Sequence, residues 1–569
     1  MKGDTISVTL DSLIHALTAD TLKSLALYRP ELALVATIVL ILLLKVFRAT
    51  AGIDSYYVAF LGSAVGLWFA IAALRDSPAS SEAFTGMLVY DAFGSYLRLV
   101  LLGFAVVFCI FTRISGIPDR EAAPDFYPLV LGATLGMCMM ASANHLLTIF
   151  LGVEMASVPS YALAGALKGR RKSSEAALKY AVYGAGAAGV MLYGVSLLAG
   201  LLGSAHLPTM AVRLADLMAH QPGADQQMVL ALGGLMIMVG LAFKLSAVPF
   251  HFWCPDVFEG ASAEVNAFLS IASKAAALAL LVRVAIGFGV MNDDKLASAH
   301  AHSPDKVASL NVADHPPAAS DDKSARRMAG PTDAAPVTQD AALAPVRTFI
   351  AQLLALVAVI TCTFGNLAAY GQDNIKRLLA YSTIAHAGYM IMPVAAAMAL
   401  AGEHPQQADK AIAALAFYIG IYLFTSLGAF AVVAFLRNAI RSEEIPDYAG
   451  LLGRAPILVI CFTLLMVSLI GIPPLAGFFG KFWIFATLVD ARLWTVLVIG
   501  GLNTAVSLYY YLRVIKVMTM DPAPESRLPF SISFVPATFV VLCTAPVLLL
   551  GIWPDSFNQW LLGITRNLL

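Results

Sequence analysis

Long apolar runs recur along the chain and are separated by short polar connections. Segments such as "LVATIVLILLL" are apolar on every face, whereas a strand of a membrane barrel alternates apolar and polar residues over about ten positions. Windows of about 19 residues that can cross roughly 30 Å of hydrocarbon give about fourteen candidate helices. They begin near residues 27, 56, 95, 126, 145, 178, 228, 263, 348, 375, 411, 456, 493 and 533. The pattern predicts an all-α integral membrane protein.

Two of the predicted helices contain proline close to a lysine and several aromatic residues. They are "GLAFKLSAVPFHFW", residues 240–253, and "IGIPPLAGFFGKFW", residues 470–483. Proline removes a backbone donor and clashes with the preceding turn, so we expect both helices to break near mid-membrane. The breaks fall in helices 7 and 12, and because five is odd the second copy must cross the membrane upside down. This predicts two inverted five-helix repeats, each containing a broken helix, with a transport site between them.

The predicted organisation has five parts. Residues 1–125 hold helices 1–3, residues 126–290 the first inverted repeat (helices 4–8), residues 347–517 the second (helices 9–13), and residues 518–569 helix 14. Between the repeats, residues 291–346 form a polar loop rich in Ala, Asp, Pro and Ser. Such a segment cannot bury enough apolar surface to offset its ordering entropy, so we expect it to be disordered.

The loops also predict an orientation. With fourteen spans both termini lie on one side, and one set of short loops carries about twice as many basic residues as the other. The richer set includes Lys168, Arg170, Arg171 and Lys172, so it is expected on the cytoplasmic side and both termini on the outer side. We interpret the first apolar run as a retained helix rather than a signal peptide.

Composition narrows the classes of function. Of the 569 residues, 59% are hydrophobic and 13% charged, and the formal net charge is zero, so no basic stripe suggests nucleic acid. Six single cysteines form neither a CxxC metal pair nor a disulfide framework. "GAGAAG", residues 184–189, matches a dinucleotide-binding pattern but lies within an apolar helix with no preceding strand, which favours close helix packing. We expect no bound cofactor or metal on this chain.

Five ionisable residues lie deep in predicted spans. They are Glu154 on helix 5, Lys244 on helix 7, Lys274 on helix 8, His386 on helix 10 and Lys481 just after the break in helix 12. A charge at a helix centre costs about 2.5 to 3.5 kcal/mol, so each residue needs a partner or a water-filled cavity. The functional interpretation is a proton path. In the structural alternative, Glu154 and Lys244 neutralise each other, the other lysines snorkel to an interface, and His386 is a satisfied core residue.

Lys244 and Glu154 suggest how such a path would switch. A buried lysine exchanges protons near pH 7 only where burial disfavours its ammonium, and a nearby glutamate acts in the opposite direction. Close to Glu154, Lys244 would hold its proton, and apart from Glu154 it would release it. The break at Pro249 lets water, backbone groups and the lysine meet.

Other polar residues have simpler interpretations. "PFHFWCPDVFEGA" places His251, Asp256 and Glu259 at the end of helix 7, where we favour a loop-stabilising role over proton transfer. Asp91 precedes helix 3 and is expected to cap it.

Several long stretches carry a resemblance to a known family. "FLGVEMASVPSYALAGALKGRRKSSEAALKYAVYGAGAAGVMLYGVSLLAG", "GLAFKLSAVPFHFWCPDVFEGA", "GNLAAYGQDNIKRLLAYSTIAHAGYMIM" and "IPPLAGFFGKFW" resemble the antiporter-like membrane subunits of bacterial NADH-quinone oxidoreductase, respiratory complex I. The family includes multisubunit cation/proton antiporter subunits. The lysine at 274, "FLGVE" and "ALKYAVYG" look most like its subunit N branch.

The resemblance implies a fourteen-helix proton-translocating subunit in the membrane arm of the complex, in the bacterial inner membrane. Glu154 and Lys244 would match the acid and lysine of the first half, Lys274 the connecting lysine, and Lys481 the lysine of the second half. NADH, FMN, iron–sulfur clusters and quinone would act in other subunits. Two alternatives stay open, namely a cation/proton antiporter subunit without a redox partner and a structural membrane-arm subunit whose lysines move no protons.

Overall fold

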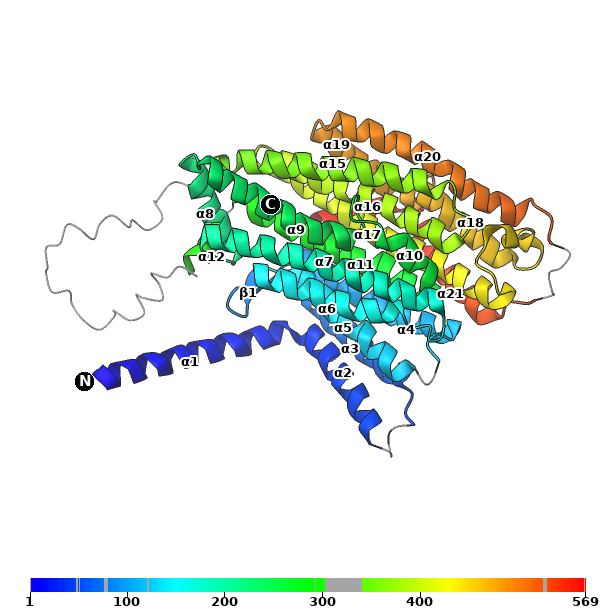
Figure 1. Cartoon of the computed structure of the whole chain (residues 1–569), viewed down its shortest axis with the longest axis horizontal. Helices are drawn as coiled ribbons and strands as arrows, with labels where there is room; N and C mark the ends of the chain where they lie inside the picture. Colours follow the sequence, from blue (N-terminus) through cyan, green and yellow to red (C-terminus); the bar gives the residue numbers. More distant parts are fainter. Residues whose placement is uncertain are drawn as a thin grey trace.

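The computed structural model describes residues 2–47, 50, 52–75, 80–119, 122–291, 293–301, 340–524, 530–566 and 568. Most of its helices lie side by side with roughly parallel axes, and α1 projects away from this bundle (Figure 1). Helices dominate because every backbone donor and acceptor in a lipid-facing segment must be satisfied within the segment. In the part of the chain that is described, the only strands form one short hairpin.

The N-terminal part contains five helices and the hairpin. The helices are α1 (Lys2–Leu27), α2 (Arg29–Val46), α3 (Ser55–Arg75), α4 (Ala92–Ser115) and α5 (Ala123–Ser142). Strands β1 (Ser81–Ala83) and β2 (Leu88–Tyr90) pair antiparallel, with Glu82 opposite Val89. Asp91 caps α4, as predicted, by accepting from the amide of Gly94 at 2.7 Å.

The middle of the chain forms α6 (Leu146–Ala164), α7 (Arg171–Leu202), α8 (Leu207–Ala219), α9 (Ala224–Leu245), α10 (Trp253–Gly260), α11 (Ala263–Gly289) and α12 (Asp293–Ala301). Helix α12 lies within the predicted polar loop, so the first residues of that loop are helical. It packs against α8. Residues 302–339, most of the segment for which disorder is predicted, lie outside the described residues. The last residues of the predicted loop are helical, because α15 begins at Ala344.

The second half forms α15 (Ala344–Ala369), α16 (Ile375–Leu400), α17 (Pro405–Ile440), α18 (Pro456–Ile470), α19 (Ala476–Asp490), α20 (Trp494–Thr519), α21 (Phe534–Ile552) and α22 (Pro554–Thr565). Two short 3₁₀ helices, Ile445–Tyr448 and Leu451–Gly453, connect α17 to α18.

A helix begins within seven residues of every predicted start, the largest offset being between residue 178 and Arg171. Among the described residues, eleven helices are long and apolar enough to cross a membrane. The number rises to twelve if the bent pair Leu17–Leu27 and Arg29–Val46 forms one span. This is fewer than the fourteen predicted spans, partly because a break divides predicted helix 12 into α18 and α19, which have 15 residues each.

Both predicted breaks are present. Helix α9 ends at Leu245, where Ser246 adopts the left-handed conformation with φ 57°, and α10 begins at Trp253. Helix α18 ends at Ile470, where Gly471 has φ 89°, and α19 begins at Ala476. Each break leaves the last carbonyls of the preceding helix available to side chains.

Three helices form the centre of the bundle. In α11, α16 and α17, 94% of the most apolar stretch is buried, compared with 28% in α7 and 22% in α3. Helix α17 contacts both α11 and α16, and α19 packs against α16 and α17. Any polar side chain that points inward from these helices is therefore shielded from lipid and needs a protein partner or water.

The glycines of "GAGAAG" all lie within α7. A Cβ atom at Gly184 would lie 2.0 Å from the hydroxyl of Tyr161, whereas Gly186 and Gly189 have open space around them. Only the first of the three is required for close helix packing.

Candidate functional site

Four of the five predicted site residues are fully buried. Lys244 on α9 and Lys274 on α11 each expose 1% of their surface, His386 on α16 exposes 2% and Lys481 on α19 exposes 3%. Glu154 on α6 is only half-buried. The residues come from both halves of the chain.

Lys244 lies in the last turn of α9, directly before the break. Its ammonium donates to the hydroxyl of Ser157 at 3.0 Å, and that hydroxyl donates to the carbonyl of Val153 at 2.6 Å. In the part of the chain that is described, no carboxylate oxygen lies within 4.0 Å of Lys244. Ser157 and Glu154 are three residues apart on α6, so they share one face of that helix. The structure therefore has the lysine near the acid but separated from it.

The carbonyls at the end of α9 also favour the cation at Lys244. The C-terminal end of a helix carries partial negative charge on its unsatisfied carbonyls. Trp253, the first residue of α10, donates from its indole nitrogen to the carbonyl of Phe243 at 3.0 Å and stacks on Tyr180 with ring centroids 4.2 Å apart. The break is thus held in a defined geometry around the lysine.

Lys274 connects the two halves of the chain. Its ammonium donates to the backbone carbonyl of Thr383 on α16 at 2.8 Å. One turn earlier on α11, the hydroxyl of Ser270 lies 3.1 Å from that of Thr383 and 3.0 Å from that of Tyr422 on α17. The Tyr422 and Thr383 hydroxyls are 3.2 Å apart. Three helices thus place three hydroxyls beside one buried lysine.

His386 lies between two tyrosines. Its Nδ1 is 2.7 Å from the hydroxyl of Tyr418 on α17, and its Nε2 is 3.2 Å from the hydroxyl of Tyr511 on α20. The Tyr511 hydroxyl also hydrogen-bonds to Ser382. The histidine is a fully hydrogen-bonded buried residue, and its ring also contacts Tyr422 with centroids 5.4 Å apart.

Lys481 occupies the second break. Its ammonium donates to the carbonyls of Leu469 at 3.1 Å and Ile470 at 3.0 Å, the last two residues of α18. It also lies 4.4 Å from the ring centroid of Tyr389, which is a cation–π contact. A helix C-terminus therefore neutralises this lysine in place of a carboxylate.

Eight hydroxyl-bearing residues that the sequence did not single out lie in this site, where each contacts a predicted residue or contacts a residue that does. They are Ser157, Ser270, Ser382, Thr383, Tyr389, Tyr418, Tyr422 and Tyr511. "YSTIAHAGYM" contains three of them within one turn or two of His386, and this clustering of hydroxyls around an ionisable residue was an available signal. The others come from distant segments and could not be paired with it.

Asp256 and Glu259 lie on α10, away from the buried lysines. Asp256 pairs with Lys179 at 2.7 Å and Arg377 at 3.0 Å, and Glu259 pairs with Arg377 at 2.7 Å and Lys172 at 2.8 Å. These ion pairs attach α10 to α7 and α16. The contacts agree with the structural role that we favour for both carboxylates.

His251 and Asp91 are also held by structural contacts. The ring of His251 packs against Phe252 and Phe364, with centroids 4.4 and 4.3 Å away. Besides capping α4, Asp91 forms a bidentate pair with Arg283 of α11 at 2.5 and 2.6 Å.

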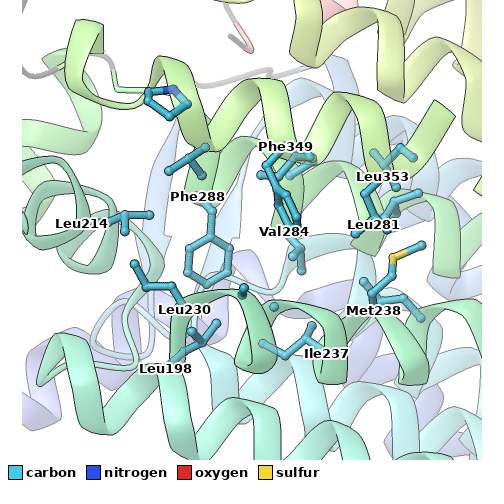
Figure 2. Close-up of a pocket in the computed structure, with 18 of the residues that line it drawn as sticks. Leu198, Leu214, Leu230, Ile237, Met238, Leu281, Val284, Phe288, Phe349 and Leu353 are labelled. Carbon is cyan, nitrogen blue, oxygen red and sulfur yellow. The ribbon is translucent and has the colours of Figure 1, made fainter. Parts of the chain in front are cut away.

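An apolar cavity of about 380 Å³ lies between α9, α11 and α15, apart from this polar site. Figure 2 shows the side chains that point into it, including Leu230, Ile237, Phe288 and Phe349. Its lining residues, all within the described part of the chain, include no ionisable side chain. The cavity therefore offers no protonatable group.

Within the same described residues, no group of three or more His, Cys, Asp or Glu side chains is arranged to hold a metal ion.

Comparison with known proteins places this arrangement in a family. Residues 143–296 and 337–507 match the family described as "NADH:quinone oxidoreductase/Mrp antiporter, TM". The chain is 35% identical over 567 residues to NADH-quinone oxidoreductase subunit N of Anaeromyxobacter sp. (strain Fw109-5), covering 95% of this chain and 96% of the relative. It is 34% identical to subunit N 2 of Sorangium cellulosum (strain So ce56), covering 94% and 96%.

Solved structures of related complexes contain chains with the same fold as this one. A chain of respiratory complex I from Thermus thermophilus superposes with a TM-score of 0.68 at 29% identity, covering 93% of this chain and 98% of that chain. A chain of the Mrp complex from Dietzia sp. DQ12-45-1b has a TM-score of 0.73 at 17% identity, covering 95% and 97%, which shows a shared fold. The family match and the near full-length relatives agree that this chain belongs to the NADH-quinone oxidoreductase subunit N family.

Proposed function

We propose that this chain is the proton-translocating subunit N of the membrane arm of an NADH-quinone oxidoreductase. The observation that carries the proposal is a set of buried lysines, Lys244, Lys274 and Lys481, within a chain that matches subunit N over nearly its whole length. Among the described residues, each lysine has only neutral acceptors within hydrogen-bond distance, either a hydroxyl or backbone carbonyls. A neutral acceptor lets a lysine both hold and release a proton, which a permanent ion pair would oppose.

In the proposed mechanism both helix breaks place a lysine beside the C-terminus of a helix. Lys244 lies at the end of α9 and Lys481 faces the end of α18, so each ammonium lies where a helix terminus favours positive charge. Approach of Glu154 to Lys244 would hold the proton on the lysine, and separation would favour release. Lys274 and His386 would pass protons between the halves.

We further propose that α9 with α10, and α18 with α19, each form one broken span. With α2 and α5 counted as spans, fourteen spans result, of which helices 4–8 and 9–13 form two inverted repeats. The basic connection that contains Lys168 and Arg170 would face the cytoplasm, and both termini would lie on the outer side of the bacterial inner membrane.

The redox chemistry would belong to other subunits of the complex. NADH, FMN, iron–sulfur clusters and quinone would react there, and conformational or electrostatic changes would reach this chain through its contacts with neighbouring membrane-arm subunits. This chain would supply proton-binding groups and would bind none of these cofactors.

A second candidate is a cation/proton antiporter subunit without a redox partner. The shared fold with the Mrp complex chain, at a TM-score of 0.73, is the observation that favours it. The two candidates differ in the proteins that surround the chain.

The test is extraction of the chain from its native membrane in mild detergent, followed by native separation. Co-migration with NADH:quinone oxidoreductase activity is the expected result, and replacement of Lys244 by methionine should then abolish proton pumping in the assembled complex. Migration with small antiporter subunits and no NADH activity would reject the proposal in favour of the second candidate. Normal pumping by the Lys244→Met complex would reject the proposed role of the lysine.

A further inference from the structure

Two tyrosine hydroxyls hold both ring nitrogens of His386 at once. The Tyr418 hydroxyl is 2.7 Å from Nδ1, and the Tyr511 hydroxyl is 3.2 Å from Nε2. A neutral imidazole has one donor and one acceptor nitrogen, and a hydroxyl can act as either. The pair of tyrosines therefore satisfies each of the two neutral tautomers, provided that the hydroxyls reverse their roles together.

The two hydroxyls have different surroundings. Tyr511 also bonds to Ser382, so its hydroxyl is held in a small network on the α16 side. Among the described residues, the hydroxyl of Tyr418 is recorded with one hydrogen-bond partner, which is His386. Within this described part of the chain, the Tyr418 hydroxyl therefore interacts with the histidine alone, whereas the Tyr511 hydroxyl is shared with Ser382.

The Tyr418 ring also touches the second broken helix. A Cβ atom at Gly480 of α19 would lie 2.6 Å from Cδ2 of Tyr418, so the absence of a side chain at residue 480 is what allows this contact. Gly480 directly precedes Lys481. A shift of α19 that moves Lys481 would therefore press on or release the Tyr418 ring.

We infer that Tyr418 and Tyr511 are positioning residues for proton transfer at His386, and that Tyr418 connects the histidine to the broken helix that carries Lys481. The inference deepens the proposed function and rests on it. In one transfer, the Tyr418 hydroxyl gives its proton to Nδ1 and takes up another proton delivered by water. At the same time the proton on Nε2 leaves to the Tyr511 hydroxyl oxygen, Tyr511 passes its own proton to the hydroxyl of Ser382, and Ser382 releases one proton to water. One proton enters and one leaves, so the net charge of the group is unchanged.

The test uses the assembled complex in membrane vesicles and a double-mutant cycle. Tyr418→Phe and Tyr511→Phe each remove one hydroxyl and keep the ring, and His386→Ala removes the relay. We expect each tyrosine variant to lower proton pumping at least about tenfold. Because the residues act as one unit, adding Tyr418→Phe to His386→Ala should cause no further loss.

Tyr96→Phe is the matched control. Tyr96 is buried, and its hydroxyl donates to the carbonyl of Ala416, two residues before Tyr418 on α17. It therefore loses one buried hydrogen bond but no contact with an ionisable group, and pumping should stay within about twofold of the unmodified complex.

Three results would overturn the inference. The first is normal pumping in Tyr418→Phe and Tyr511→Phe. The second is a loss in the double variant equal to the product of the two single losses, which is the behaviour of independent structural defects. The third is failure of Tyr418→Phe to assemble together with normal pumping in Tyr511→Phe. If Lys481→Met pumps normally, the proposed function itself fails, so the two failures are distinguishable.

Discussion

The ammonium of Lys244 donates to the hydroxyl of Ser157 at 3.0 Å, on the helical face that also carries Glu154. The lysine is almost completely buried, whereas Glu154 is half-buried three residues earlier on α6. Ser157 is thus the acceptor of the Lys244 ammonium in this structure, and we propose that a change of lysine rotamer or a shift of α6 exchanges it for the carboxylate of Glu154. On this proposal, a neutral and a charged acceptor within one helical turn would give the ammonium two alternative contacts.

Replacing Ser157 by alanine should disturb this contact without removing either ionisable group. The buried ammonium would lose its acceptor, and a group left unsatisfied costs about 1 to 3 kcal/mol. We expect proton pumping per NADH oxidised to fall about tenfold, and Ser157→Thr, which restores the hydroxyl, to recover most of it. Pumping would be measured in vesicles with a pH-sensitive dye. Equal losses in the alanine and threonine variants would contradict the role of the hydroxyl.

Lys244→Arg distinguishes a proton carrier from a fixed charge. Arginine keeps the positive charge but does not release its proton in proteins. We therefore expect Lys244→Arg and Lys244→Met both to abolish pumping, although only the second removes the charge. Lys168→Met, in the exposed connection before α7, is the control and should pump normally. Pumping by the arginine variant would favour the structural interpretation of this lysine.

Gly480→Ala tests the close contact between α19 and Tyr418. The added Cβ atom would lie 2.6 Å from the tyrosine ring, which must move. We expect pumping to fall at least fivefold while the complex still assembles, because the contact affects the neighbours of Lys481. Gly501→Ala on α20 adds the same methyl group where nothing lies within 4 Å. Since alanine is the better helix former, that control should assemble and pump at least as well as the unmodified complex.

Arg377→Gln should loosen α10 rather than block proton transfer. It removes two partly exposed ion pairs, with Asp256 at 3.0 Å and Glu259 at 2.7 Å. Such pairs contribute about 1 kcal/mol or less each, so we expect the subunit to dissociate at a temperature a few degrees lower in a thermal assay of the complex. Arg454→Gln, an exposed arginine in the connection before α18, is the control. A complete loss of pumping at normal thermal stability would instead place Arg377 in the proton path.

The sequence by itself determined the approximate starts of the long apolar helices, both helix breaks and the five ionisable residues in predicted spans, whereas eleven or twelve helices rather than fourteen are long and apolar enough to span a membrane among the described residues. Hydropathy, proline and charge act over one or two turns of a single segment, so they can be read from the local sequence. They also sufficed to favour a structural role for Asp256 and Glu259, because two acids beside a loop are readily paired.

Only the tertiary structure decided which groups face one another. Ser157 meets Lys244 across 87 positions of sequence, and Tyr511 meets His386 across 125. No local pattern distinguishes Tyr511, which contacts the histidine, from Tyr510, which donates to Asn366. Packing of α11, α16 and α17 at the centre of the bundle sets these contacts, because side chains from several helices must fill one shared interior and satisfy its polar groups.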